Sequence, residues 1–216
     1  MLRIRKKLAY LFAFLLFVVV FPVKAEYTLL HGPLTNDAMG AHIYELDNGL
    51  RVYLTRNSEE PRFYSEIVVR AGSKHDPPDA TGIAHYLEHM LFKGTKKLGT
   101  LDFESEQNHL DRIKALYEEH FYTTNEEQRI EIYKLINLEN QSAAKYAVPN
   151  ELDRIYNSIG ARSLNAHTSV EETVYKVDLP IDRLEQWAHI ETERFREPIF
   201  RLFQTEIETV YEEKNR

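Results

Sequence analysis

The sequence predicts an α+β domain. Short apolar segments typical of β-strands lie within residues 42–71 and 163–179. Apolar residues that recur at three- and four-residue steps, typical of amphipathic helices, occupy residues 102–146 and much of the chain after residue 180. Strands, helices, further strand and then further helices, in that order along the chain, describe an α+β architecture.

The first 25 residues differ from the rest and have the layout of a secretory signal. Four cations within residues 3–7 precede an unbroken apolar run of 14 residues, Leu8–Phe21, and small residues stand at Val23 and Ala25. The run is short for a membrane span and suits a signal peptide. We therefore expect a signal peptide over residues 1–25 and an exported protein, periplasmic or extracellular. A membrane attachment is expected only if the signal stays uncleaved.

The composition of the remaining residues, 26–216, limits the classes of partner and site. Removing five cations and no anions changes the formal charge of the chain from −7 to −12. A nucleic-acid partner is not expected, because binding to phosphates needs a basic surface. The length suits one domain. Cysteine is absent, so no disulfide is expected and a metal site must use His, Asp or Glu.

The first half of this domain predicts strands followed by a short helix. Residues 42–55 are strand-like, with a turn at residues 47–49 (Asp-Asn-Gly). Residues 63–71 are β-rich, and three successive apolar residues at 67–69 predict a central strand. A loop rich in Pro, Asp and Gly then leads to a helix over residues 83–93. Gly94 stands where helices commonly end in the left-handed conformation.

The second half predicts a charged helical hairpin, further strand and two more helices. Residues 102–146 are helical, with a break and a cap at residues 123–125 (Thr-Thr-Asn). A further helical turn is expected at 151–158 and strand at 163–179. Pro180 opens a helix that extends to about Arg196. The last helix is expected to begin near Phe203 and to continue to the final residue.

The strongest chemical signal is the motif His85-Tyr-Leu-Glu-His89. At 100° per residue, the helix places His85, Glu88 and His89 together, almost opposite an apolar face of Ile83, Leu87, Met90 and Leu91. Two imidazoles at positions i and i+4 can bind one metal ion, and the carboxylate at i+3 lies beside it. The pattern H-x-x-E-H is the reverse of the zinc-binding motif H-E-x-x-H.

The neighbourhood of this motif resembles the pitrilysin/insulysin family of zinc metallopeptidases. The resemblance is carried by residues 82–95 (GIAHYLEHMLFKGT), 46–52 (LDNGLRV), 68–73 (VVRAGS), and 165–169 with 172–175 (NAHTS and ETVY). It covers about residues 42–100 and 151–216. It implies a mixed or antiparallel sheet packed against helices, as in the N-terminal lobe of those peptidases.

The resemblance also implies a set of site residues around one Zn²⁺ ion. His85 and His89 match two zinc ligands, and Glu88 matches the general base. The third ligand of the family is a Glu that follows another acidic residue by seven positions. Glu213 matches this ligand, and Glu206 matches the carboxylate that supports it. Glu212, one residue out of this register, is the fallback ligand.

The implied activity is that of a zinc-dependent metalloendopeptidase acting on peptides or small unfolded proteins. In the family the peptide lies along an edge strand, and Asn165 and Ala166 are the matching substrate-binding positions. His167, on the same strand, either faces the cleft or has a structural role. The alternative is a non-catalytic or inactive fragment or subunit of such a peptidase. The presence of both histidines and both glutamates favours the peptidase.

Two features depart from the family pattern. His89 and Glu213 are 124 residues apart, longer than the usual spacing, so we expect residues 107–150 to be a helical insertion that either shapes substrate access or decorates the surface. The chain also ends three residues after Glu213, inside a predicted helix. We therefore expect a truncated domain, incomplete at its C-terminus. Such a chain would need a second homologous lobe or a partner subunit, and alone it would show little or no activity.

Overall fold

The structure, a computed structural model, describes residues 26–214. The expected signal peptide and the expected continuation of the last helix to residue 216 lie outside the described residues. The chain divides into two compact units, Met1–Asn57 and Ser58–Arg216, and each is described by itself. No helix between residues 26 and 214 combines the length and the apolar character needed to cross a bilayer.

The first unit contains a three-stranded antiparallel sheet in the order β1-β2-β3. Its strands are β1 (Tyr27–His31), β2 (His42–Leu46) and β3 (Arg51–Leu54). β2 and β3 form the hairpin that the turn residues predict, with Gly49 at φ 83° in the connection. β1 was not predicted from the sequence, because all five of its residues are exposed and no buried face imposes an alternation of apolar and polar residues.

The second unit contains an antiparallel sheet in the order β4-β6-β5. These strands are β4 (Arg62–Val69), β5 (Arg162–Thr168) and β6 (Thr173–Pro180). The expectation that residues 63–71 form a central strand is wrong within the described residues, because β6 is central and β4 lies at the edge. β6 buries five of its eight residues, whereas Val68 in β4 is 49% exposed. An apolar run therefore did not distinguish a central strand from an edge strand here.

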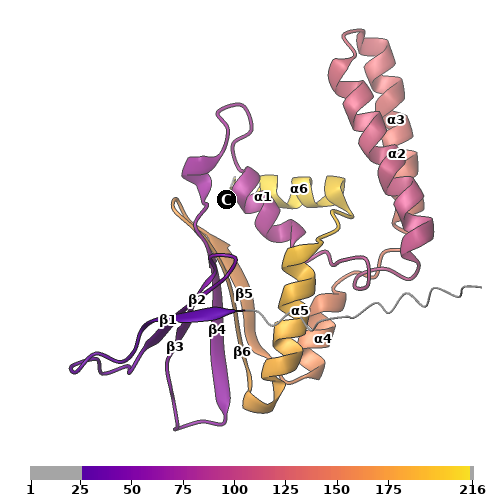
Figure 1. Ribbon diagram of the computed structural model, residues 1–216. Coiled ribbons are helices and arrows are strands. Elements are labelled where there is room, and N and C mark those ends of the chain that lie inside the picture. Colours follow the sequence, from indigo (N-terminus) through magenta and orange to yellow (C-terminus); the bar gives the residue numbers. More distant parts are fainter. Residues whose placement is uncertain (1–25, 215–216) are drawn as a thin grey trace, which may run out of the picture. The chain divides into compact units, whose positions relative to one another are not determined.

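Two helices cover one face of this second sheet (Figure 1). They are α4 (Glu151–Ser158) and α5 (Leu184–Arg196), and the short 3₁₀ turn Ile181–Arg183 precedes α5. Leu152 and Tyr156 of α4 pack against Val177 and Leu179 of β6, all nearly or fully buried. This packing confirms the predicted α+β class, with an antiparallel sheet against helices.

The charged segment forms a helical hairpin with the break where the sequence predicts it. Its helices are α2 (Phe103–Tyr122) and α3 (Glu126–Ala143). The side chain of Asn125 caps α3 by accepting a hydrogen bond from the backbone N–H of Gln128 at 3.0 Å. A cluster of buried side chains joins the two helices: Leu116, Ile132 and Ile136.

The predicted metal-motif helix is α1 (Ile83–Met90), and the 3₁₀ turn Ser73–His75 lies in the loop before it. Helix α1 ends three residues earlier than predicted, and Gly94 adopts φ 104° in the turn that follows the helix. The expected apolar face is only half correct: Met90 and Leu91 are buried, whereas Ile83 and Leu87 are 48% and 44% exposed. On its histidine side α1 lies beside α6 (Phe203–Lys214), which contacts both His85 and His89.

A buried arginine joins the segment after α1 to the starts of α2 and α6. Arg201, 2% exposed, donates two hydrogen bonds to the fully buried carboxylate of Glu106, at 2.8 and 3.0 Å. The remaining donors of its guanidinium reach the backbone carbonyls of Lys93, Thr95 and Leu98 at 2.8 to 3.0 Å. The pair is therefore desolvated and fully hydrogen-bonded, which is the condition under which a buried ion pair is tolerated.

Replacing Arg201 by Met is expected to destabilise the fold by about 3–5 kcal/mol, because it leaves the Glu106 carboxylate buried without a partner. Urea unfolding of the variant would measure this loss. Lys134→Met removes an exposed ion pair with Glu131 and should change stability by less than about 1 kcal/mol. If Arg201→Met were as stable as this control, the proposed role of the buried pair would be wrong.

Candidate metal centre

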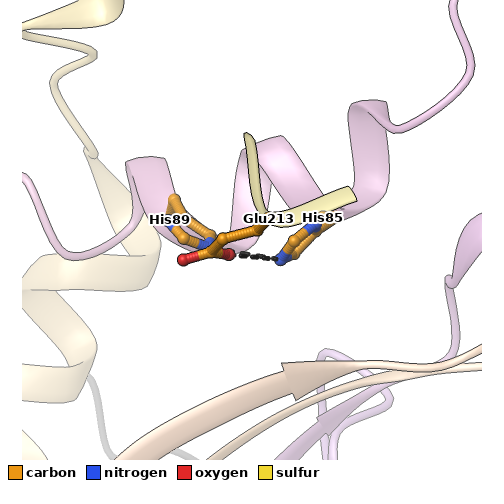
Figure 2. Close-up of side chains that lie close together, drawn as sticks. All are labelled: His85, His89 and Glu213. Carbon is orange, nitrogen blue, oxygen red and sulfur yellow. Dashed lines mark hydrogen bonds and ion pairs between the residues drawn. The ribbon is translucent and has the colours of Figure 1, made fainter. Parts of the chain in front are cut away.

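Two helices bring His85, His89 and Glu213 to one point (Figure 2). The histidines lie one turn apart on α1, and Glu213 comes from the last turn of α6. The two Nε2 atoms are 3.2 Å apart, and Oε2 of Glu213 lies 3.5 Å from His85 Nε2 and 3.4 Å from His89 Nε2. Among the described residues, these three form the group of His, Asp and Glu side chains close enough to share one metal ion.

The spacing of these three donor atoms fits a zinc ion. Zinc binds His nitrogen and carboxylate oxygen at about 2.0–2.2 Å in tetrahedral geometry, so neighbouring ligand atoms are separated by roughly 3.3–3.5 Å. The separations of 3.4 and 3.5 Å fall in this range, and the separation of 3.2 Å lies just below it. Two histidines and one glutamate are also a donor set found at catalytic zinc sites, where the fourth position stays open. The residues present therefore fit the group.

Glu206 orients one of the histidines from the opposite side. Its Oε1 lies 2.8 Å from Nδ1 of His89, and its Oε2 lies 2.5 Å from Nζ of Lys93. A proton on Nδ1 of the neutral ring leaves the lone pair on Nε2, which is the atom that faces His85 and Glu213. Burial by itself raises the pKa of Glu206, but hydrogen bonds from Lys93 and His89 outweigh it and lower the pKa below its ordinary value.

Glu88 lies outside the three-residue group. Its side chain is 7% exposed, and its Oε2 accepts a hydrogen bond from the hydroxyl of Thr168 at 2.6 Å. Thr168 in turn lies 3.2 Å from the hydroxyl of Thr173 on β6. Thr168 was not among the site residues predicted from the sequence, and the available signal was its position in the segment 165–169 that resembles the family. The sheet thus holds the Glu88 carboxylate in one orientation.

The start of α1 is capped by a residue that the sequence analysis also missed. Gly82, at φ 97°, precedes the helix and has no side chain to cap it. The carboxylate of Asp76 takes this role, accepting hydrogen bonds from the backbone N–H of Gly82 at 2.6 Å and of Ala84 at 2.9 Å. A carboxylate at a helix N-terminus also interacts favourably with the helix dipole. Asp76 therefore helps to fix the helix that carries both histidines.

The expected substrate-binding residues lie on β5, which is an edge strand among the described residues. Asn165 pairs with Lys176 and Ala166 with Tyr175 on β6, so the opposite edge of β5 has no partner strand in the described part of the chain. Side chains alternate along a strand, and Thr168 points toward Glu88. His167 therefore lies on the opposite face of the sheet from Glu88, which favours a role outside the metal centre.

The other acidic residues of α6 do not join the group. Glu208 and Glu212 are exposed, and neither contributes an atom to the cluster of His85, His89 and Glu213. Glu206 and Glu213 lie on the α1 side of the helix because seven residues span almost two full turns. The arrangement favours Glu213 over the fallback position Glu212.

Known proteins share the fold of this chain and the sequence around its metal motif. The model of the family Insulinase (Peptidase family M16) matches residues 51–113, which include both histidines and Glu88. The probable zinc protease PqqL of Haemophilus influenzae is 39% identical over 85 residues, covering 38% of this chain and 9% of that protein. The match thus spans about a tenth of the length of that relative.

Solved structures show the same fold. The first half of the periplasmic protease PqqL from Escherichia coli superposes with a TM-score of 0.55 at 21% identity, covering 87% of this chain and 31% of that one. Pitrilysin superposes with a TM-score of 0.50 at 21% identity, covering 81% and 14%. At this identity the likeness concerns the fold, while the family assignment depends on the sequence matches. Over residues 51–113 the chain is therefore similar to the insulinase family, peptidase family M16.

Proposed function

We propose that this chain forms the zinc-binding part of a metalloendopeptidase, in which His85, His89 and Glu213 hold one Zn²⁺ ion. The observation that carries the proposal is the set of three separations of 3.2, 3.4 and 3.5 Å between donor atoms contributed by two helices. A structural site in a cysteine-free chain would have four protein ligands, whereas three leave room for a water or substrate.

The residues around this group suit hydrolysis of a peptide bond. Bound zinc would lower the pKa of a water and polarise a peptide carbonyl. Glu88 accepts the proton of the attacking water and then donates it to the leaving amine. Thr168 orients the Glu88 carboxylate for both transfers, since its hydroxyl donates to one of the two carboxylate oxygens. Glu206 keeps the Nε2 lone pair of His89 directed at the site.

The substrate is an extended peptide that adds to the open edge of β5 beside Asn165 and Ala166. Main-chain hydrogen bonds along a sheet edge supply affinity without selecting side chains, which suits unfolded peptides or small unfolded proteins. A second homologous lobe or a partner subunit completes the chamber around the peptide. The match to a structure described as the first half of a protease is consistent with such an arrangement.

The protein acts outside the cytoplasm after removal of residues 1–25. Support comes from the order of cations, apolar run and small residues at the N-terminus, and from the description of the Escherichia coli PqqL protein as periplasmic. N-terminal sequencing of the exported product tests this proposal. A product that begins at Glu26 would agree with it, and a product that begins at Met1 would contradict it.

The metal content of the chain tests the proposed site directly. Purified chain loaded with zinc and freed of excess metal is expected to contain about one zinc per molecule, measured by elemental analysis. The variant with both His85 and His89 changed to Ala should contain none, because only one potential ligand remains. The variant with His31 and His42 changed to Ala is the matched control. Equal zinc in all three proteins would contradict the proposal.

Peptide hydrolysis tests the activity itself. We expect an unstructured fluorogenic peptide to be cleaved by the chain together with a second lobe, to lose that cleavage on chelation and to regain it with zinc. Zinc binding without cleavage in the completed assembly would favour the alternative, a non-catalytic subunit.

A further inference from the structure

The helical hairpin contacts the first turn of the helix that carries Glu206 and Glu213. The ring of Tyr117 on α2 packs edge-on against Phe203, with centroids 5.7 Å apart. The hydroxyl of Tyr133 on α3 accepts a hydrogen bond from the Gln204 side chain at 2.5 Å. Asn140, also on α3, reaches the same Gln204 side chain at 3.4 Å. Both helices of the hairpin therefore hold the beginning of α6.

The same residues connect the hairpin to α1. Phe203 packs edge-on against Tyr86 with centroids 5.1 Å apart, and its carbonyl accepts a hydrogen bond from the Tyr86 hydroxyl at 2.9 Å. Tyr86 directly follows the metal-motif residue His85. The rings of Tyr117, Phe203 and Tyr86 thus form a continuous contact from the hairpin through α6 to α1.

The backbone at the entrance to α6 needs such support. Leu202, immediately before the helix, adopts φ 56°, a left-handed conformation that costs a non-glycine residue about 1–3 kcal/mol. Its carbonyl nevertheless accepts the first-turn hydrogen bond from Glu206 N–H at 3.1 Å. Conformations of this kind persist only where surrounding contacts impose them. Here those contacts come from Arg201 on one side and from Phe203 and Gln204 on the other.

Because α6 is long, a small change in its direction at the first turn displaces the residues of its last turn. Phe203 and Glu213 are ten residues apart, or about 15 Å along the helix. A tilt of about 10° at the first turn would move Glu213 by roughly 2.6 Å. Zinc ligands must lie within about 0.2 Å of their proper distances. The direction in which α6 leaves its first turn therefore decides whether the third ligand reaches the histidines.

We propose that the α2–α3 hairpin is a brace that sets the direction of α6, with Tyr117 and Tyr133 as positioning residues for the metal centre. This inference rests on the proposed function, because it assumes that Glu213 binds zinc. The hairpin acts through its contacts with Phe203 and Gln204 at the start of α6. It therefore raises metal affinity by preorganising the third ligand.

Zinc affinity of hairpin variants tests the brace, measured by competition with a chromophoric chelator. Tyr117→Ala is expected to weaken zinc binding by about 10- to 100-fold, the range found when a partner outside the ligand shell is lost. Tyr117→Phe keeps the ring and should restore affinity to within about twofold. Tyr133→Phe removes only the hydroxyl that binds Gln204 and should weaken binding by several-fold. Hydrogen exchange at the amides of α6 should become faster in the two weakened variants.

The control is Phe121→Ala at the far end of the hairpin, where the side chain is 76% exposed and packs on Tyr122. This variant should bind zinc like the wild type. An equal loss of affinity in Phe121→Ala would overturn the brace, because it would show general loosening of the hairpin. Wild-type affinity in folded Tyr117→Ala and Tyr133→Phe would also overturn it.

These outcomes are separate from failure of the proposed function. If the wild-type chain bound no zinc, or if Glu213→Gln bound it as tightly as the wild type, the proposed metal site itself would be wrong. If Glu213→Gln lost zinc while the hairpin variants kept it, the site would stand and only the brace would fall. The melting temperature of each variant, taken without zinc, identifies any that is unfolded. If Tyr117→Ala is unfolded, the zinc affinity of Tyr133→Phe, the milder change, tests the brace.

Discussion

Replacing Glu213 by Gln is expected to abolish most zinc binding, whereas replacing Glu212 by Gln leaves it unchanged. The Glu213 carboxylate lies 3.4 and 3.5 Å from the two histidine nitrogens, so the amide removes the only negative charge among the three donors. Loss of a partner outside the ligand shell lowers metal affinity by about 10- to 100-fold. The loss of zinc affinity in Glu213→Gln should be larger. Glu212 is exposed and is not one of the three donors. Competition titration with a chelator would measure both variants.

Glu206→Gln should give an intermediate loss, because the amide oxygen can still accept from Nδ1 of His89 while the charge is gone. The order of affinities is therefore wild type and Glu212→Gln, then Glu206→Gln, then Glu213→Gln. If Glu212→Gln lost zinc and Glu213→Gln kept it, the register of α6 would be one residue wrong. Circular dichroism at 222 nm would verify that the total helix content is the same in each protein.

Replacing Glu88 by Gln is expected to lower peptide hydrolysis by about 10²- to 10⁴-fold, the range for loss of a general acid or base. The amide cannot take the proton of the attacking water. Zinc content should remain at the wild-type level, because Glu88 is not one of the three donors. Hydrolysis is measured with the second lobe present, and zinc content is measured on the same sample.

Two further variants sharpen this experiment. Glu185→Gln removes an exposed carboxylate on α5, 91% exposed, and should leave hydrolysis unchanged. His85→Ala should lose both zinc and hydrolysis. A general base is distinguished from a metal ligand by a variant that keeps zinc and loses hydrolysis. Among these three variants, only Glu88→Gln is expected to do so. Peptidase activity that survives in Glu88→Gln would show that another group accepts the proton.

Local patterns were enough to predict most helices and strands. The break at residues 123–125 was predictable because Asn125 caps the next helix through its own side chain. The bounds of α4 were predicted as observed, Glu151–Ser158. The i, i+4 histidine pair was also readable, since one helical turn places both rings on the same side whatever surrounds them. In each case the interacting groups lie within a few residues of one another.

Local patterns failed where the outcome depended on what packs against an element. Residues 67–69 are continuously apolar, yet β4 lies at the edge of its sheet because β6 pairs with both neighbours. Leu87 belongs to the apolar side of α1 by periodicity, yet it is 44% exposed, whereas α6 lies against the histidine side of the helix. Hydrophobicity records a preference for burial, and the arrangement of distant segments decides where burial is available.

The two histidines and Glu88 could be singled out from their spacing in the sequence, and the seven-residue step from Glu206 to Glu213 was singled out by the resemblance to the family. Only the tertiary structure placed Glu213 on the histidines, Glu206 on Nδ1 of His89 and Thr168 on Glu88. These contacts join residues 80 to more than 120 positions apart. Spacing along a chain determines which side chains share a helix face, whereas the packing of whole elements determines which faces meet.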